Sequence, residues 1–312
     1  MSASTEIKSG GIATFVVKVN GSPIADELSV LSVHIEKKVN RIASAKVTIL
    51  DGEPNTGKFD ASSSATFVPG ASISIEAGYD NTNAVIFSGV IMSQTIRIDN
   101  LVGSALEVEC RDNAIKMIVG RKSLTYSKQK DSDIMTSLIG NYSGLSADVT
   151  ATSTTWPEQV QFYVTDWDYL LSLAEANGLI VTTLNGKISV FPPDKNSSSV
   201  LTVTYGDTLL EFNAKLSAVT QLGNVAANSW DFKTQAVVTG NAASDVIGSG
   251  NLTTKKLSEV VGLSTYQLQT SAPLETADLT NWSKAQIIKS EYSKIMGEAK
   301  FQGTNLVDPE NI

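Results

Sequence analysis

The chain has 312 residues, of which 42% are hydrophobic and 18% charged, and its net charge of −8 gives a pI near 4.8. This length allows a large core and favours two or three domains. Such an acidic protein would repel a phosphate backbone, so direct nucleic-acid binding is not expected. The chain has one cysteine and one histidine, which excludes internal disulfides and metal sites built from cysteines. It also leaves few residues that could form the nucleophile–base pair of a catalytic site. We therefore expect no cofactor, no metal site and no enzymatic activity.

The N-terminus, MSASTEIKSGG, is polar and lacks the basic start and apolar core of a secretory signal. No stretch approaches the ~18 apolar residues that a bilayer-crossing helix needs. We expect synthesis in the cytoplasm without a signal peptide.

The first hundred residues alternate apolar and polar positions, which predicts β-strands separated by short turns. Asn20–Gly21 is a strong hairpin signal. In residues 43–50, the buried face should be formed by Ala43, Ala45, Val47 and Ile49. Six or seven such strands without a long helix predict a β-barrel or sandwich.

The two rare side chains fall on opposite faces of these strands. Cys110 shares the apolar face of its strand with Leu106 and Val108, which predicts an inert core thiol. Leu31, Val33 and Ile35 alternate with Ser32, His34 and Glu36, so His34 should lie on the exposed face of its strand.

A basic segment follows in this otherwise acidic chain. It is either a solvated loop or a contact with an acidic partner surface. We keep the second interpretation as the candidate partner contact, formed by Lys116, Arg121, Lys122, Lys128 and Lys130. After it, Ser132 is a candidate cap for a short helix.

The stretch TDWDYLLSLAEANGL, residues 165–179, predicts a capped helix rather than an active site. Thr165 and Asp168 have capping-box spacing, and acidic residues suit the positive end of a helix dipole. Trp167 begins an apolar stripe with Leu170, Leu171 and Ala174. Side chains at positions i and i+2 point apart, which disfavours Asp166 and Asp168 as a catalytic pair.

Asn177–Gly178 should end this helix, and Asn185–Gly186 should join two further strands as a hairpin. From about residue 200 the β-pattern returns, with a faint echo of the first part. Residues 240–263 are small and polar and predict a long loop. Residues 277–296 predict a helix that ends at Gly297, with one apolar side formed by Leu279, Trp282, Ile288, Tyr292 and Ile295.

Four stretches in this order, LEVECRDNAIKMIVGRK, YVTDWDYLLSLAEANGL, ANSWDFKTQAVV and GEAKFQGTNLVDPENI, resemble the hub proteins of contractile injection machines, the VgrG and phage baseplate-hub family. The resemblance implies a mainly β fold with an α+β insert and two related β-barrel tube domains. It implies a homotrimer that forms a pseudo-hexameric ring. The implied division is 1–115 for the first tube domain, 116–198 for the insertion and 199–312 for the second tube domain. The chain stops before the oligonucleotide-binding-type barrel and spike, and Asp308–Pro309–Glu310 stand where the family often has a Pro-Gly turn.

The function implied by this resemblance is a structural hub that adapts a hexameric inner tube to a trimeric spike in a phage tail, type VI secretion system or extracellular injection particle. Baseplate proteins would be further partners, and a spike tip protein and effectors would bind through the part beyond this chain. Such a hub would be assembled into the particle and ejected on contraction. The alternative is a carbohydrate-binding or adhesin module, for which the placement of Trp156 and Trp230 is the open question. A hydrolase ranks third because no convergent acid–base set is present.

Overall fold

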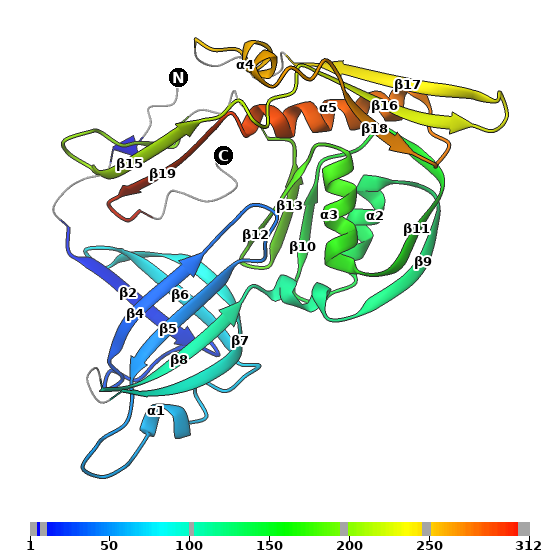
Figure 1. Cartoon of the computed structure of the whole chain (residues 1–312). Coiled ribbons are helices and arrows are strands. Elements are labelled where there is room, and N and C mark those ends of the chain that lie inside the picture. The colour runs from blue at the N-terminus through cyan, green and yellow to red at the C-terminus, as the bar shows by residue number, and fades with distance from the viewer. Residues whose placement is uncertain (1–4, 7–10, 100–102, 194–198, 245–250, 305–312) are drawn as a thin grey trace.

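The computed structural model describes residues 5–6, 11–99, 103–193, 199–244 and 251–304 (Figure 1). The fold is mainly β, as predicted, with helices gathered in the middle and late parts of the chain. No helix within these ranges is long and apolar enough to span a bilayer.

The first part is a curled antiparallel sheet with strand order β3-β2-β6-β7-β8-β5-β4 (Figure 1). Its strands are β2 (Ala13–Val19), β3 (Ser22–Pro23), β4 (Val30–Glu36), β5 (Ser44–Leu50), β6 (Ser72–Tyr79), β7 (Thr82–Asp99) and β8 (Gly103–Arg111), with the one-turn helix α1 (Asp60–Ser63) after β5. β3 and β4 are the edges, and no hydrogen-bonded pair within the described ranges joins them. The predicted closed barrel is therefore not seen in the described residues, because β3 and β4 are not paired with each other.

Local signals in this part are confirmed. Asn20 and Gly21 both have positive φ, 50° and 82°, as the tight turn between β2 and β3 requires. Cys110 is buried, and this burial raises the pKa of its thiol to about 12. His34 is exposed. Leu31, however, is exposed although it belongs to the apolar pattern, because the register of β4 against β5 shifts between Val30 and Ser32.

The middle part has its own hydrophobic core. The elements are η1 (Asn113–Ile118), β9 (Arg121–Lys130), α2 (Asp131–Gly140), β10 (Ser146–Val149), β11 (Thr155–Thr165), α3 (Asp166–Ala176), β12 (Ile180–Leu184) and β13 (Lys187–Phe191). β10, β13 and β12 form one small sheet, and β9 and β11 form a separate two-stranded ribbon. The core between them includes Ile134, Leu138, Trp167, Leu170 and Val190.

Helix α2 begins earlier than predicted. It starts at Asp131, and the backbone N–H of Lys130 donates to Asp133 Oδ2 at 3.4 Å, so Ser132 is inside the helix and not its cap. Helix α3 starts where expected, because the Thr165 hydroxyl accepts from the backbone N–H of Asp168 at 3.1 Å. Gly178, with φ 69°, follows its last turn as predicted.

The last part holds β14 (Leu201–Thr202), β15 (Leu209–Leu216), β16 (Asn224–Asp231), β17 (Ala236–Ala243), α4 (Thr254–Val261), β18 (Tyr266–Thr270), α5 (Thr276–Tyr292) and β19 (Ile295–Phe301). β17, β16 and β18 form a sheet against which α5 packs. β15 pairs only with β19 among the described strands, and β14 pairs with β1 (Thr5–Glu6). This half is thus divided among separate small sheets rather than a closed barrel.

Three predictions in this part need correction. The expected loop over 240–263 contains helix α4, and residues 245–250 of this stretch lie outside the described ranges. The Thr253 hydroxyl caps the start of the helix by accepting a hydrogen bond from Lys256 N, and Gly262, with φ 74°, ends it. Helix α5 ends at Tyr292, so Gly297 lies inside β19 instead of ending the helix. Ile295, assigned to the apolar side of the helix, is an exposed strand residue. The Asp308–Pro309–Glu310 turn also lies outside the described ranges.

Candidate interaction site

The basic segment is a strand and not a loop. Arg121 begins β9 and Lys130 ends it, so at ~3.4 Å per residue the two ends lie about 30 Å apart. Lys116 precedes this strand, in η1, and its ammonium donates to the Ser143 carbonyl at 2.9 Å. The five predicted contact residues therefore form two groups at opposite ends of a ribbon, with Lys128 and Lys130 at the far end.

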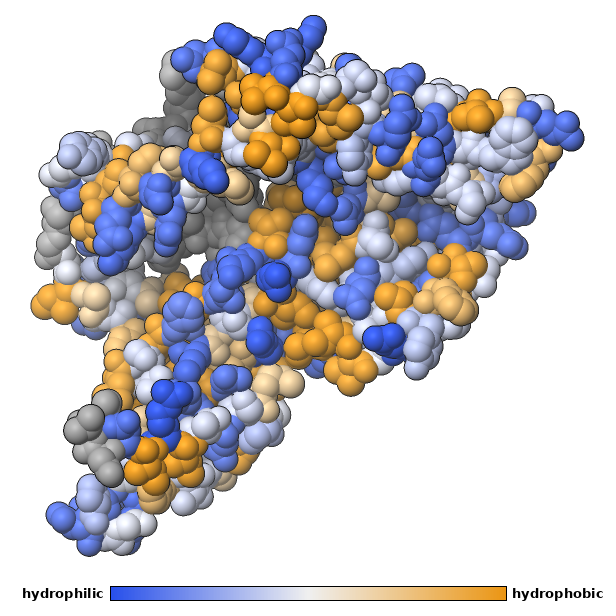
Figure 2. Space-filling view, viewed as in Figure 1, coloured by the Kyte–Doolittle hydropathy of each residue, from blue (hydrophilic) through white to orange (hydrophobic). Residues whose placement is uncertain are grey.

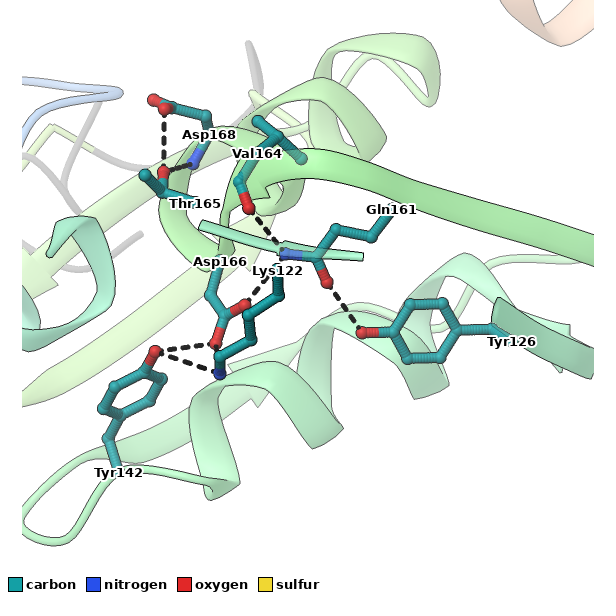
Figure 3. A network of polar contacts seen from close by, with 8 residues as sticks. All are labelled: Lys122, Tyr126, Tyr142, Gln161, Val164, Thr165, Asp166 and Asp168. Atoms are coloured by element: carbon teal, nitrogen blue, oxygen red, sulfur yellow. Dashed lines mark hydrogen bonds and ion pairs between the residues drawn. The ribbon is translucent and has the colours of Figure 1, made fainter. Parts of the chain in front are cut away.

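Lys122 has an internal role that the sequence did not reveal. Its ammonium lies 2.6 Å from Asp166 Oδ2, and the Asp166 side chain has no solvent exposure (Figure 3). Tyr142 Oη donates to the same oxygen at 2.6 Å, and Gln161 Nε2 donates to the other oxygen at 2.9 Å. The carboxylate at the start of α3 is thus tied to β9, to the end of α2 and to β11.

These contacts decide the ionisation of the buried carboxyl. Burial alone would raise the pKa of Asp166, but the hydrogen bonds from Gln161, Lys122 and Tyr142 outweigh it and hold the pKa below its ordinary value. The hydrogen bond to Asp166 raises the pKa of Lys122. Burial, followed by the hydrogen bond to Asp166, raises the pKa of the Tyr142 phenol.

This network lacks the chemistry of an acid–base site. General acid–base catalysis needs a group whose pKa lies near the working pH and which can reach a substrate. Asp166 is ionised, buried and surrounded by donors, while Asp168 hydrogen-bonds the Thr165 hydroxyl at 2.7 Å. The two aspartates hold the start of α3 in place, which is the structural role that their spacing predicted.

The remaining cations of the segment face outward. Lys116, Arg121 and Lys128 are exposed, and Lys130 is half-buried. The Arg121 guanidinium lies over the Tyr163 ring, 5.4 Å from its centroid. Within the described ranges none of these four is in an ion pair, so they, and not Lys122, are available to an acidic partner.

Beside Arg121 the structure exposes apolar side chains that the sequence analysis missed. The pairing of β11 with β9 shifts between Gln161 and Val164, and this bulge turns Phe162 outward with 81% of its surface exposed. Tyr163 has a φ of 47°, a conformation that a bulky residue adopts only where its surroundings hold it there. In the run VQFYV, residues 160–164, apolar and polar residues do not alternate strictly. This irregularity was the sequence signal from which the bulge and its exposed side chains could have been predicted.

Two hollows flank α5. One, of about 550 Å³, lies between α3 and α5, and a smaller one, of about 210 Å³, lies beside it; Trp282 lines both. Trp156 lines the smaller hollow together with Asp131, whose oxygens already accept from Gln159 and Asn177. In the part of the chain that the structure describes, no group of three or more His, Cys, Asp or Glu side chains could hold a metal ion.

Comparison with known proteins gives a family and a fold. A family model described as the Alg8 N-terminal domain matches residues 9–312. No curated protein sequence matches.

Several solved structures share the fold at low sequence identity. The 43 kDa tail protein of prophage MuSo2 from Shewanella oneidensis is 12% identical with a TM-score of 0.65, over 96% of this chain and 88% of that one. A tail protein from Neisseria meningitidis MC58 is 15% identical with a TM-score of 0.62, over 91% and 79%. A prophage tail protein from Listeria monocytogenes EGD-e is 10% identical with a TM-score of 0.51, over 87% and 76%.

Proposed function

The chain belongs to the Alg8 N-terminal domain family. From its fold, which it shares with phage tail proteins, we propose that it is a structural hub of a contractile injection machine. In this role it joins a hexameric inner tube to a trimeric spike. The observation that carries the proposal is similarity along almost the whole chain to the MuSo2 tail protein, over 96% of this chain and 88% of that one. A shared accessory domain would give similarity over only one part.

The arrangement of the chain suits an adapter between threefold and sixfold symmetry. In the proposed division, two β-rich parts, 1–115 and 199–312, flank a middle part, 116–198. Three copies can offer six similar surfaces only if each copy supplies two. The two β-rich parts are the candidates for this, and they would close into barrels within a homotrimeric ring.

The proposed partners follow from this role. The ring contacts the inner tube protein on one side, and baseplate proteins contact its outer surface. A spike and its tip protein would be reached through residues beyond this chain. No catalysis is part of the proposal, since the only buried carboxylate cluster considered as an active site is committed to holding α3.

The alternative, a carbohydrate-binding module, would need tryptophan rings open to a ligand. Trp167 is only 5% exposed and belongs to the core, while Trp156 and Trp282 are half-buried beside α5. Trp230 is 43% exposed. One exposed ring on a strand is a weak platform for a sugar, so this placement favours the hub.

A stoichiometry measurement tests the proposal. The chain would be mixed with purified rings of the inner tube protein encoded with it, and the complexes weighed by native mass spectrometry. We expect three copies of this chain on six tube subunits. Absence of any complex, or a 1:1 ratio of subunits, would contradict the proposal, and binding to a glycan array in place of the tube would favour the alternative.

A further inference from the structure

The ribbon formed by β15 and β19 has one apolar and one polar face. Opposite residues on one face are Phe212 and Ala299, Ala214 and Gly297, and Leu216 and Ile295. On the other face they are Glu211 and Lys300, Asn213 and Glu298, and Lys215 and Met296. Met296 is the exception on the polar face, and the alternation of the other residues is typical of a ribbon whose apolar face is covered.

Nothing in the described ranges covers this face. Phe212 is 67% exposed, and Leu216 and Ile295 are each about half exposed. Leu210, at the bulge that begins the ribbon, is also exposed. Figure 2 shows hydrophobic residues at the surface of this ribbon, at the upper left of the view. Because an isolated two-stranded ribbon is at best marginally stable in water, the face needs a partner.

The same chain carries an apolar hollow of matching chemistry. It lies on the first sheet, where the edge strand β4 stands away from β2 and β6, and has a volume of about 710 Å³. Its lining includes Phe15, Leu31, Val33 and Ile35, and none of the described residues that line it is charged. Phe15 and Leu31 are each more than half exposed. Gly303 and Thr304, which follow β19 in the chain, also line this hollow. The Gly303 carbonyl is held there because it accepts a hydrogen bond from the Tyr79 hydroxyl at 2.9 Å.

We propose that the apolar face of the β15–β19 ribbon of one copy docks into the hollow beside β4 of a second copy. This contact rests on the proposed function, because it is an interface within the hub ring. The two surfaces differ and belong to the same chain, so each copy can donate a ribbon to one neighbour and accept one from another. A heterologous contact of this kind forms a closed ring where the rotation between neighbouring copies closes after a whole number of copies, which is three in the proposed hub.

Charge selects a second copy as the occupant. The chain carries a net charge of −8, so two copies repel each other over most of their surfaces. The ribbon face and the hollow are both uncharged, and the ribbon's polar face balances Glu211 and Glu298 against Lys215 and Lys300. Two copies can therefore meet here without burying an unpaired charge.

The surface that this contact buries is small. The ribbon face is smaller than the roughly 20–30 residues per side that a stable complex buries. The contact alone should therefore be weak, and association should appear only at micromolar or higher concentration.

Sedimentation velocity across about 10–500 μM tests the contact on the full chain, the range that a weak interface requires. We expect the wild-type protein to associate as concentration rises. Phe212→Asp places a charge on the ribbon face and Leu31→Asp places one in the hollow, and both should remain monomeric. Two matched controls carry the same charge nearby: Asn213→Asp on the polar face of β15, and His34→Asp on the outward face of β4. Both controls should associate like the wild type, and circular dichroism verifies that all four variants fold.

Mixing the two defective variants distinguishes docking of a ribbon into a hollow from docking of one ribbon on another. Leu31→Asp keeps an intact ribbon and Phe212→Asp keeps an intact hollow, so the mixture should form a 1:1 heterodimer that cannot grow. Self-association of Leu31→Asp alone would mean that ribbons dock on each other, and would overturn the proposal. A wild-type chain that stays monomeric throughout, or a Phe212→Asp variant that associates normally, would also overturn it.

The tube-binding measurement separates the two proposals. If the wild type and Phe212→Asp both bind tube rings with three copies on six subunits, the ribbon contact is wrong and the hub function stands. If the chain associates through its ribbon but never binds the tube, the contact stands and the hub function fails.

Discussion

At the scale of single residues, the pair Lys122–Asp166 shows how burial decides what a charge can do. The Asp166 side chain is fully buried, whereas that of Lys122 is 38% exposed. The lysine can turn towards water if its partner is lost, but the carboxylate cannot. For this reason Lys122 is poorly suited to binding a partner, although the sequence places it among four other cations.

The two halves of this pair should respond unequally to mutation. Lys122→Met leaves a buried carboxylate without its cation, which should cost about 3–5 kcal/mol of the free energy of unfolding. Asp166→Asn leaves a lysine that can reach solvent, so the loss should be clearly smaller. Urea unfolding of both variants measures the difference. Equal losses would show that the burial asymmetry does not control the pair. Lys128→Gln, which changes an exposed cation of the same strand, serves as a control of unchanged stability.

The same carboxylate should make stability depend on acid. The pKa of Asp166 is depressed in the folded chain, so its stabilising contribution is complete above the pKa of the unfolded chain, about 3.9. It is lost as the pH falls through the lower, folded value. The stability gap between wild type and Asp166→Asn should therefore be constant near neutral pH and shrink in strong acid. A gap that instead widens as the pH falls would mean that the folded pKa is raised.

At the scale of elements, local signals predicted much of the fold. Turns that need positive φ, such as Asn20–Gly21 and Asn185–Gly186, were readable because few residues accept that conformation. The alternation in β5 and the cap of α3 at Thr165 were also readable, because each depends on neighbours in the chain.

Features that depend on distant residues were not readable. The role of Lys122 needs Asp166, Tyr142 and Gln161 from three other elements. Gly240 resembles a loop glycine, but a Cβ there would lie 2.3 Å from the backbone N of Thr280, so it is required by the close approach of α5 to β17. The ribbon of β15 and β19 also looks like half-buried sheet in sequence, and only the structure shows that its apolar face is bare.

Two tryptophans on helices allow a test of the difference between what the sequence predicts and what the structure shows. Sequence spacing placed both Trp167 and Trp282 on apolar faces, but only Trp167 is in the core. Trp167→Ala should lower the free energy of unfolding by about 3–5 kcal/mol, because it leaves a cavity in the core of the middle part. Trp282→Ala opens hollows that already reach solvent and should cost markedly less. Thermal melting compares them, and an equal loss would place Trp282 in the core as the sequence suggested.

At the scale of the whole molecule, the middle part is attached to both β-rich parts. Towards the first sheet, the Asn40 side chain accepts from Val181 N and the Thr183 hydroxyl accepts from Ala43 N, each at 2.9 Å. Towards the last part, the Thr154 hydroxyl donates to Asp278 at 2.6 Å, and Lys289 pairs with Glu175. The middle part can therefore hold the two β-rich parts at a set spacing, which the proposed adapter role requires.

The last prediction concerns which surface meets which partner. The middle part occurs once in each chain, so in a trimer it can make only threefold contacts, whereas the tube offers six equivalent ones. We expect the loops at the ends of the two β-rich parts to dock the tube, and the middle part to face baseplate proteins. The triple variant Arg121→Gln, Lys128→Gln, Lys130→Gln removes outward charges and leaves the Lys122–Asp166 pair intact.

This variant should weaken baseplate assembly and leave tube docking unchanged. Exposed charges act over about 10 Å at 0.1 M salt, so the wild-type advantage in baseplate binding should be largest at low ionic strength and fade as salt is added. Arg41→Gln, Lys46→Gln and Lys58→Gln, which remove three positive charges from the first part, serve as a charge-matched control. Pull-down of baseplate proteins at several salt concentrations measures one contact, and co-sedimentation with tube rings measures the other. A particle reconstruction with the middle part wedged between hub and tube, and the ends of the β-rich parts free, would reverse the assignment.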